Sequence, residues 1–222
     1  MLFLIGCLLA PFSFGQERAA RVEGPEHFRW SEANAHELDH RYTIRSAVGL
    51  SPRQRETLTK AVLQQLKRHK SLDAFFVGMP EQKLIDLAAN TRIERMDLNG
   101  DGSPEIIAQA NGLGPCGGTG NCIFWIFQMN SSGLKLLLDT FDSEAGFQVI
   151  GIRPWSTDGY RDLVLGAHLS AASRDLVWYK YANGAYRRWR CYNLTDQGEN
   201  GTPARTAAIV QAGCAEMFSS GK

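Results

Sequence analysis

The chain has 222 residues, of which 44% are hydrophobic and 21% charged, as is ordinary for a globular protein, and this composition excludes a wholly disordered chain. Its 24 Lys and Arg residues nearly balance its 23 Asp and Glu residues. The resulting net charge of +1 gives no electrostatic reason to expect nucleic acid or an anionic membrane as a partner.

The N-terminal segment predicts an exported protein. Residues 1–15 carry no charged side chain, and their apolar run ends at Pro11. The run is too short to span a bilayer but suits a signal peptide, with cleavage before Gln16. No basic residue follows the first methionine, and a buried N-terminal segment is one alternative. Lipidation at Cys7 is another, because Leu4-Ile5-Gly6-Cys7 looks like a lipobox. We expect a secreted or periplasmic protein that is not an integral membrane protein.

Two helices are expected within an N-terminal helical segment, residues 16–90. Ser51 and Pro52 form a helix start, because serine caps helices well and proline suits the first turn. Apolar residues then recur at a spacing of three to four, as a helix buried on one face requires. A second helical stretch begins at Pro80. The two apolar stripes are Leu58, Val62, Leu63 and Leu66, and then Leu84, Ile85, Leu87 and Ala88.

After Asn90 the pattern changes to short β-type runs separated by turn residues. Asn183-Gly184 gives the strongest hairpin signal, since a tight primed turn needs positive φ angles. Residues 123–127 are apolar throughout, which predicts a central strand covered on both faces. The runs are Arg92–Asp97, Glu105–Ala110, Cys122–Met129, Leu134–Phe141, Phe147–Arg153, Asp162–Ala167, Leu176–Tyr181 and Ala185–Cys191.

These elements predict an α+β fold in which N-terminal helices are followed by a predominantly antiparallel β-meander domain. The β-rich domain covers residues 91–196. Residues 197–222 are expected to form a C-terminal tail, because they are rich in Gly, Ala and Ser.

Four cysteines remain after removal of the leader, and an even number in an exported protein suggests disulfides. Cys116 and Cys122 flank a Gly-rich loop that is flexible enough to close locally. We predict the pair Cys116–Cys122 and, by elimination, Cys191–Cys214. Free thiols and a four-cysteine zinc site are the alternatives, although no C-x-x-C spacing is present.

The segment 97–105 is a candidate calcium loop between two strand runs. It places side-chain oxygens at alternate positions of a short loop, and calcium prefers six to eight hard oxygen ligands. Gly102 permits the sharp turn, and Ala108 stands where an EF-hand would need its last glutamate, so the loop is not an EF-hand. An Asx-rich turn without an ion is the alternative. The candidate ligands are Asp97, Asn99, Asp101, the Ser103 carbonyl and Glu105.

This loop resembles the Asp-x-Asp-x-Asp-Gly-x-x-Asp loop of FG-GAP repeats, the integrin α propeller-type or VCBS-like family. Asn99 and Glu105 depart from that pattern. Residues 157–166 resemble the second half of another copy, without its leading acidic residues. There are too few strands for a propeller, so only the loop chemistry is carried over. The resemblance implies a secreted, non-catalytic adhesion or binding role.

A second motif suggests another class of function. His36-Glu37-Leu38-Asp39-His40 satisfies H-E-x-x-H, in which two histidines on one helix face bind zinc and the glutamate acts as general base. The polar character of residues 30–45 and the lack of a defined third ligand argue for a solvated segment instead. A secreted zinc-dependent hydrolase based on His36, Glu37 and His40 is therefore the alternative hypothesis.

Several aromatic residues flank the predicted Asn183-Gly184 hairpin. Trp178, Tyr181 and Trp189 can either stack on a ligand or form part of the core. Taken together, the residues predict an exported non-catalytic binding or structural protein with a calcium-stabilised β domain. The expected partner is an unidentified protein or a carbohydrate.

Overall fold

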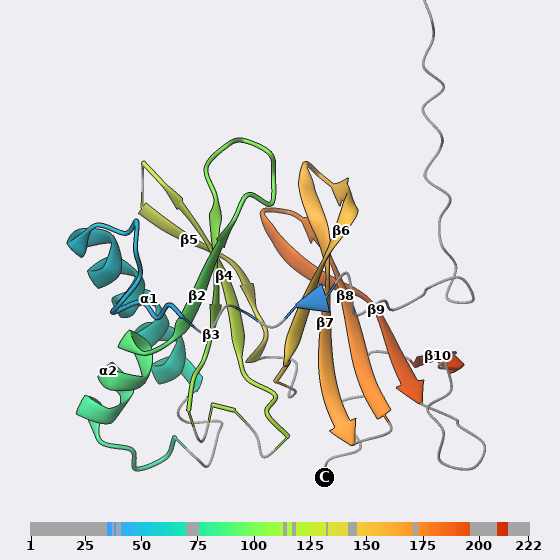
Figure 1. Cartoon of the computed structure of the whole chain (residues 1–222), viewed down its shortest axis with the longest axis horizontal. Helices are drawn as coiled ribbons and strands as arrows, with labels where there is room; N and C mark the ends of the chain where they lie inside the picture. The colour runs from blue at the N-terminus through green and yellow to red at the C-terminus, as the bar shows by residue number, and fades with distance from the viewer. Residues whose placement is uncertain are drawn as a thin grey trace, which may run out of the picture.

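The structure is a computed structural model that describes residues 35–36, 38, 41–69, 76–112, 115–116, 119–131, 133–141, 146–170, 173–195 and 208–212. Two helices and ten strands lie within these residues (Figure 1). The helices are α1 (Pro52–His69) and α2 (Glu81–Ala89). The strands are β1 (Ala35–His36), β2 (Arg92–Met96), β3 (Glu105–Gln109), β4 (Phe124–Asn130), β5 (Gly133–Asp139), β6 (Val149–Thr157), β7 (Tyr160–Ser170), β8 (Ser173–Ala182), β9 (Ala185–Thr195) and β10 (Ala208–Ala212).

Both predicted helices are present, and α1 begins with a reciprocal cap. The Gln54 amide donates to Ser51 Oγ at 3.2 Å, and the Ser51 amide donates to Gln54 Oε1 at 2.8 Å. Such a capping box satisfies backbone amides that have no partner within the first turn. Helix α2 follows Pro80 directly, and it buries Leu84 and Ala88.

The strands form two antiparallel sheets. One has four strands in the order β2-β3-β4-β5, and the other has six in the order β1-β6-β7-β8-β9-β10. Each contains a meander of consecutive strands, and the chain passes from one sheet to the other between β5 and β6. The predicted Asn183-Gly184 hairpin is confirmed, with φ angles of 54° and 83° at those two residues between β8 and β9.

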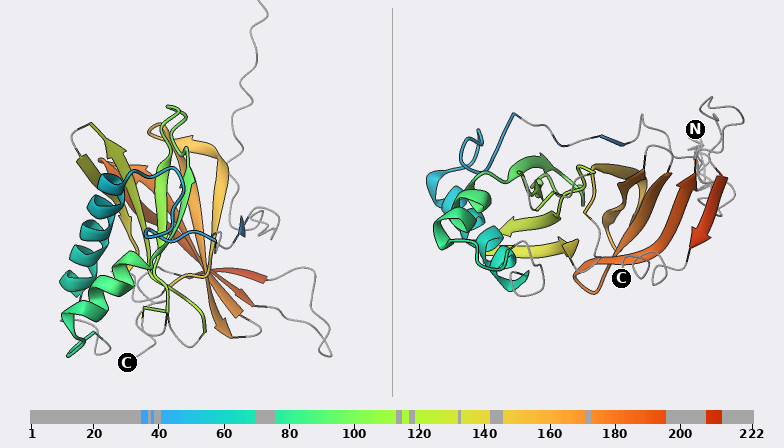
Figure 2. Two further views of the ribbon diagram at one scale, coloured as in Figure 1. Left: turned by 60° about the vertical axis from the view of Figure 1, so that its left-hand side comes forward. Right: turned by 90° about the horizontal axis from the view of Figure 1, so that it is seen from below.

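The fold has three layers, which are the two helices, the four-stranded sheet and the six-stranded sheet (Figure 1 and Figure 2, left). One hydrophobic cluster fills each space between neighbouring layers. Alternation along β4 explains this, because Phe124 and Ile126 face the other sheet whereas Trp125 and Phe127 face the helices. The inter-sheet cluster includes Ile107, Phe124, Ile126, Phe147, Leu163, Leu165, Val177 and Tyr179. The helix-side cluster includes Leu58, Val62, Leu66, Leu84, Ile93, Ile106, Trp125 and Phe127. The prediction of a central strand covered on both faces is confirmed.

The predicted α+β class, with N-terminal helices followed by a single meander domain, is wrong. The fold is mostly β, with two sheets packed face to face and two short helices covering one of them. The physical reason is that β3 is buried at every position and β4 over its first four residues, so both faces of the two strands must be covered. The helices cover one face, and the second can be buried only if the meander breaks after β5 and the later strands fold back over it.

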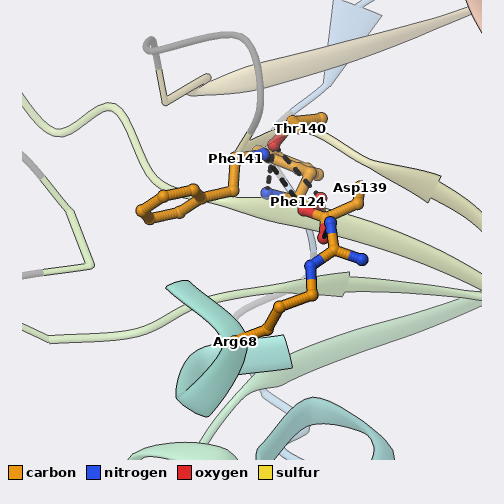
Figure 3. Close-up of polar contacts among 5 residues, drawn as sticks. All are labelled: Arg68, Phe124, Asp139, Thr140 and Phe141. Carbon is orange, nitrogen blue, oxygen red and sulfur yellow. Dashed lines mark hydrogen bonds and ion pairs between the residues drawn. The ribbon is translucent and has the colours of Figure 1, made fainter. Parts of the chain in front are cut away.

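The C-terminal end of α1 is tied to the end of β5 (Figure 3). Arg68 reaches from the helix to Asp139 Oδ2 at 3.5 Å, and Asp139 Oδ1 accepts a hydrogen bond from the Phe141 amide at 3.0 Å. Next along the chain, the Thr140 amide donates to the Phe124 carbonyl at 3.0 Å, while the Phe124 amide donates to Thr140 Oγ1 at 2.8 Å. The ion pair thus links α1 to the rim of the four-stranded sheet, and the Thr140–Phe124 bonds hold the end of β5 beside β4.

Two cysteine predictions can be compared with the structure. Cys116 and Cys122 form a disulfide across the loop before β4, as predicted. Cys191 on β9 is also disulfide-bonded, and its predicted partner Cys214 lies outside the described residues. Disulfides are typical of proteins that fold in an oxidising compartment. The predicted signal peptide 1–15 and Cys7 also lie outside the described residues.

Among the described helices, none is long and apolar enough to cross a bilayer.

Candidate functional site

The predicted calcium loop connects β2 to β3, two neighbouring strands of the four-stranded sheet. The ladder between them closes at the pair Met96 and Glu105, so residues 97–104 form the connection. Gly100 and Gly102 have φ angles of 76° and 81°, a region that is favourable only for glycine. The sharp turn expected at Gly102 is therefore present, and a second one precedes it.

Hydrogen bonds within the loop run from backbone amides to acidic side chains. Asp97 accepts from the Gly100 amide at 2.7 Å and from the Gly102 amide at 3.0 Å. Asp101 Oδ1 accepts from the Ser103 amide at 2.7 Å, and Asp101 Oδ2 accepts from Asn99 Nδ2 at 2.8 Å. The three predicted ligands Asp97, Asn99 and Asp101 thus lie within one turn of the chain, where they organise the backbone.

Glu105 closes the base of the loop. It is fully buried, and its Oε2 accepts a hydrogen bond from the Leu98 amide at 2.8 Å. Its Oε1 lies 3.4 Å from Gln128 Nε2 on β4. Ser103 is exposed at the outer side of the loop. The predicted ligands therefore form an exposed to half-buried group at the tip and a buried carboxylate at the base.

The acidic groups of the loop influence each other electrostatically. Burial raises the pKa of Glu105, and the negative charges of Asp101 and Asp97 raise it further. In contrast, hydrogen bonds from backbone amides, above all that of Gly102, lower the pKa of Asp97. The opposite shifts reflect the two environments, because one carboxylate is solvated by amides and the other is desolvated beside like charges.

The donor set has the chemistry that calcium requires, but it is not a ready-made metal cage. Carboxylate and amide oxygens are hard ligands, and each carboxylate oxygen has a second lone pair beyond the one that accepts an amide. Nevertheless, no three His, Cys, Asp or Glu side chains converge as metal ligands in the described part of the chain. Binding of calcium would thus require Asp97 and Asp101 to turn their free lone pairs inward.

Residues 157–166, which resemble the second half of another loop copy, include the β6–β7 turn. Asp158 and Gly159, with φ angles of 48° and 82°, form the tight turn of the β6–β7 hairpin. This hairpin touches the first loop, because the Arg161 amide donates to the Leu98 carbonyl at 2.8 Å. An Asp-Gly pair between two strands is a hairpin signal of the same kind as the Asn183-Gly184 pair of the β8–β9 turn. The sequence therefore contained the information that predicts the β6–β7 turn.

Tyr160, which sequence reasoning missed, joins the loop to the other sheet. Its hydroxyl accepts from Gln128 Nε2 at 2.7 Å and from Asn99 Nδ2 at 3.2 Å. Since Gln128 also approaches Glu105, a continuous polar chain runs from the loop tip through Tyr160 to the buried carboxylate. No local motif indicates this contact, because Tyr160 lies far from the loop in the sequence and belongs to the other sheet, which has six strands.

A cleft of about 290 Å³ opens on the helix side of the loop. Gly102, Ser103 and Pro104 form one wall, and Arg95 and Met129 contribute to the others. This volume is close to the lower limit for a site that encloses a small molecule. We therefore assign it no ligand.

The zinc motif does not have the expected backbone where the structure describes it. His36 belongs to β1 and pairs with Ile150 of β6 in an antiparallel register. The expected zinc site needs a helix, in which residues four apart lie about one turn from each other on one face, whereas the backbone at Ala35–His36 is extended. Glu37 and His40 lie outside the described residues.

The three candidate stacking residues separate onto two faces of the six-stranded sheet. Tyr181 belongs to the inter-sheet side, where its ring stacks on Tyr160 with centroids 3.9 Å apart. Trp178 and Trp189 lie on the outer face, with centroids 5.1 Å apart. The register between β8 and β9 shifts between Trp178 and Tyr179, so Trp189 occupies a bulge. Trp155 of β6 adds a third ring, 5.8 Å from Trp178.

Comparison of the chain with protein-family models, curated proteins and solved structures finds no match. The resemblance of residues 97–105 to FG-GAP loops consequently rests on the residues of the loop itself.

Proposed function

We propose that this chain is an exported, non-catalytic binding or structural protein whose two-sheet domain is stabilised by calcium at the Asp97–Glu105 loop. The observation that supports the proposal is the concentration of Asp97, Asn99 and Asp101 in one turn above the buried Glu105. Burial and then the negative charges of Asp101 and Asp97 raise the pKa of Glu105, and a divalent cation at the loop would neutralise these charges.

The position of the loop explains how calcium would stabilise the domain. Leu98 and Asn99 contact the start of β7, so the loop bridges both sheets. An ion that binds only the folded loop stabilises the folded state by mass action. Calcium would therefore hold the sheets together at this rim and have no chemical step to perform.

Export is supported by the cysteines. The Cys116–Cys122 disulfide and the disulfide-bonded Cys191 suit a secreted or periplasmic protein. Mass spectrometry of the protein recovered from its natural host tests this. A mature chain that begins at Gln16 and is found outside the cytoplasm supports export, and an unprocessed cytoplasmic chain with reduced cysteines contradicts it.

Calcium binding is tested by thermal unfolding of the mature protein with calcium, with magnesium and with a chelator. We expect calcium at 100 times its dissociation constant to add about 2.7 kcal/mol to the free energy of unfolding. The double variant Asp97→Asn/Asp101→Asn should lose this gain. The matched control Glu56→Gln/Asp86→Asn removes two exposed helix charges and should keep it. Identical melting curves of the unsubstituted protein in calcium and chelator would refute the calcium site.

A further inference from the structure

The outer face of the six-stranded sheet carries a concentration of positive charge that the net charge of +1 conceals. We define the basic face as Lys180 of β8 and Arg187, Trp189 and Arg190 of β9. Lys180 and Arg187 are direct cross-strand partners, and Arg190 is the partner of Trp178. Side chains of cross-strand partners share one face of a sheet, so these cations project together.

The local arrangement costs stability. Like charges directly opposite each other on neighbouring strands repel. Within the described residues, neither Arg187 nor Arg190 forms an ion pair. Positions that break a local rule without a compensating contact are the ones where function is expected. An anionic ligand would supply the missing compensation.

The only carboxylate that contacts the described part of this face is already engaged. Asp162 is fully buried, and it accepts hydrogen bonds from Thr157 Oγ1 at 2.7 Å and from Trp178 Nε1 at 3.1 Å. It lies 4.0 Å from Lys180 Nζ. Asp162 therefore approaches one of the three cations, which leaves an excess of positive charge at the surface.

Trp189 holds two of the cations in place. Lys180 Nζ lies 3.8 Å from the centre of its ring, and Arg190 Cζ lies 4.1 Å from it. Such cation–π contacts fix long side chains that would otherwise be free to rotate, so less entropy is lost when a ligand binds. With 36% of its surface exposed, Trp189 also offers an apolar contact beside the charges.

We propose that the basic face binds an acidic polysaccharide, a sugar chain that bears repeated carboxylate or sulfate groups. Arg187 and Arg190 pair with Lys180 and Trp178, two residues apart on β8, so they are spread over about 7 Å along the sheet, which suits a ligand with repeated anions better than one small anion. The exposed indole complements the C–H faces of sugar rings, whereas the face has no aliphatic residue for insertion into a lipid surface. The proposal depends on export, which the proposed function includes, but not on calcium.

The test is a calorimetric titration of the mature protein with polygalacturonate, dextran sulfate and neutral dextran at low and near-physiological salt. Binding to at least one acidic polymer, weakening as salt increases, with none to dextran, is expected. Replacing two charge-assisted contacts by Arg187→Gln/Arg190→Gln should weaken binding about tenfold or more. The control Arg53→Gln/Lys60→Gln removes the same charge from exposed positions on α1 and should bind normally.

Three outcomes would overturn the proposal. They are absence of binding to both acidic polymers, equal weakening in the control variant, and tighter binding to anionic phospholipid vesicles or single-stranded DNA than to either polymer. Retained circular dichroism of the Arg187→Gln/Arg190→Gln variant separates lost binding from misfolding. The Asp97→Asn/Asp101→Asn variant should still bind the acidic polymer, so failure of the calcium site and failure of the basic face are distinguished.

Discussion

The Glu105 carboxylate accepts a hydrogen bond from the Leu98 amide, with 2.8 Å between Oε2 and the nitrogen. This bond places an acidic group at the buried base of an acidic loop. Burial first, and then the charges of Asp101 and Asp97, raise the pKa of Glu105 above 4.5. Between the unfolded-state and folded-state pKa values, Glu105 of the folded protein therefore keeps a proton that Glu105 of the unfolded chain releases. The favourable contribution of this proton to the free energy of unfolding is fully present below pH 4.5 and is lost as the pH rises through the folded-state pKa.

Glu105→Gln should test this linkage, because the amide keeps an acceptor for Leu98 but does not titrate. We expect the free energy of unfolding of the unsubstituted protein, relative to the variant, to fall as the pH rises above 4.5 and through the folded-state pKa of Glu105, in the absence of calcium. Urea unfolding at several pH values measures it. Glu56→Gln is an opposite-sign control, since a hydrogen bond from Lys60 lowers the pKa of Glu56. If the free energy of unfolding relative to each variant changed with pH in the same direction for Glu105→Gln and Glu56→Gln, the raised pKa of Glu105 would be contradicted.

Tyr160→Phe should weaken the link between the loop and the six-stranded sheet. The substitution keeps the ring that stacks on Tyr181 but removes the acceptor used by Gln128 and Asn99. We expect a loss of about 1 to 2 kcal/mol in the free energy of unfolding, because two partly buried donors lose a partner. Tyr181→Phe removes a hydroxyl with a single exposed contact at 3.4 Å and should change stability by less than about 0.5 kcal/mol. Denaturant unfolding compares the two.

Gly146→Ala should destabilise the fold through a steric overlap. A Cβ at this position would lie 2.6 Å from the backbone carbonyl of Asn121, which cannot move without disturbing the segment before β4. We expect a loss of roughly 2 to 3 kcal/mol. Gly100→Ala is a useful comparison, because it meets no atom within 4 Å but has a φ of +76°, so that only about 1 kcal/mol of backbone strain is expected. A smaller loss for Gly146→Ala than for Gly100→Ala would show that the backbone relaxes.

Removing the Cys116–Cys122 disulfide should be destabilising without abolishing the fold. The bond closes a short loop of sequence separation 6, for which chain entropy predicts a contribution of about 2 kcal/mol. The variant Cys116→Ser/Cys122→Ser should lose that amount in urea unfolding under oxidising conditions. Peptide mapping of the unsubstituted protein should also find Cys191 joined to Cys214. Unchanged stability of the double variant would mean that the bond constrains nothing.

The sequence predicted local structure far better than the arrangement of the sheets. All eight predicted β runs contain a strand, and the Ser51 cap and the Asn183-Gly184 turn are correct, because each is encoded within a few residues. The break between β5 and β6 was missed, since it depends on which faces bury each other. Strands β1 and β10 were missed too, because each is completed only by a distant partner strand.

The candidate site shows the same limit. Residues 97–105 were identified by their spacing, whereas the polar chain through Tyr160 and Gln128 is created by two sheets meeting. Separation of Tyr181 from Trp178 follows from simple alternation along β8. The position of Trp189 does not, because it depends on a bulge that no local pattern announces.

That bulge determines how an insertion or deletion in β9 would be tolerated. Tyr186 and Cys191 both belong to the inter-sheet cluster although they are five residues apart, an odd interval that strict two-residue alternation would place on opposite sides. The additional residue at Trp189 reconciles them. Deleting Trp189 would thus leave a regular strand in which Tyr186 and Cys191 still face the other sheet, whereas deleting a different residue while the bulge is retained would turn one half of the strand over.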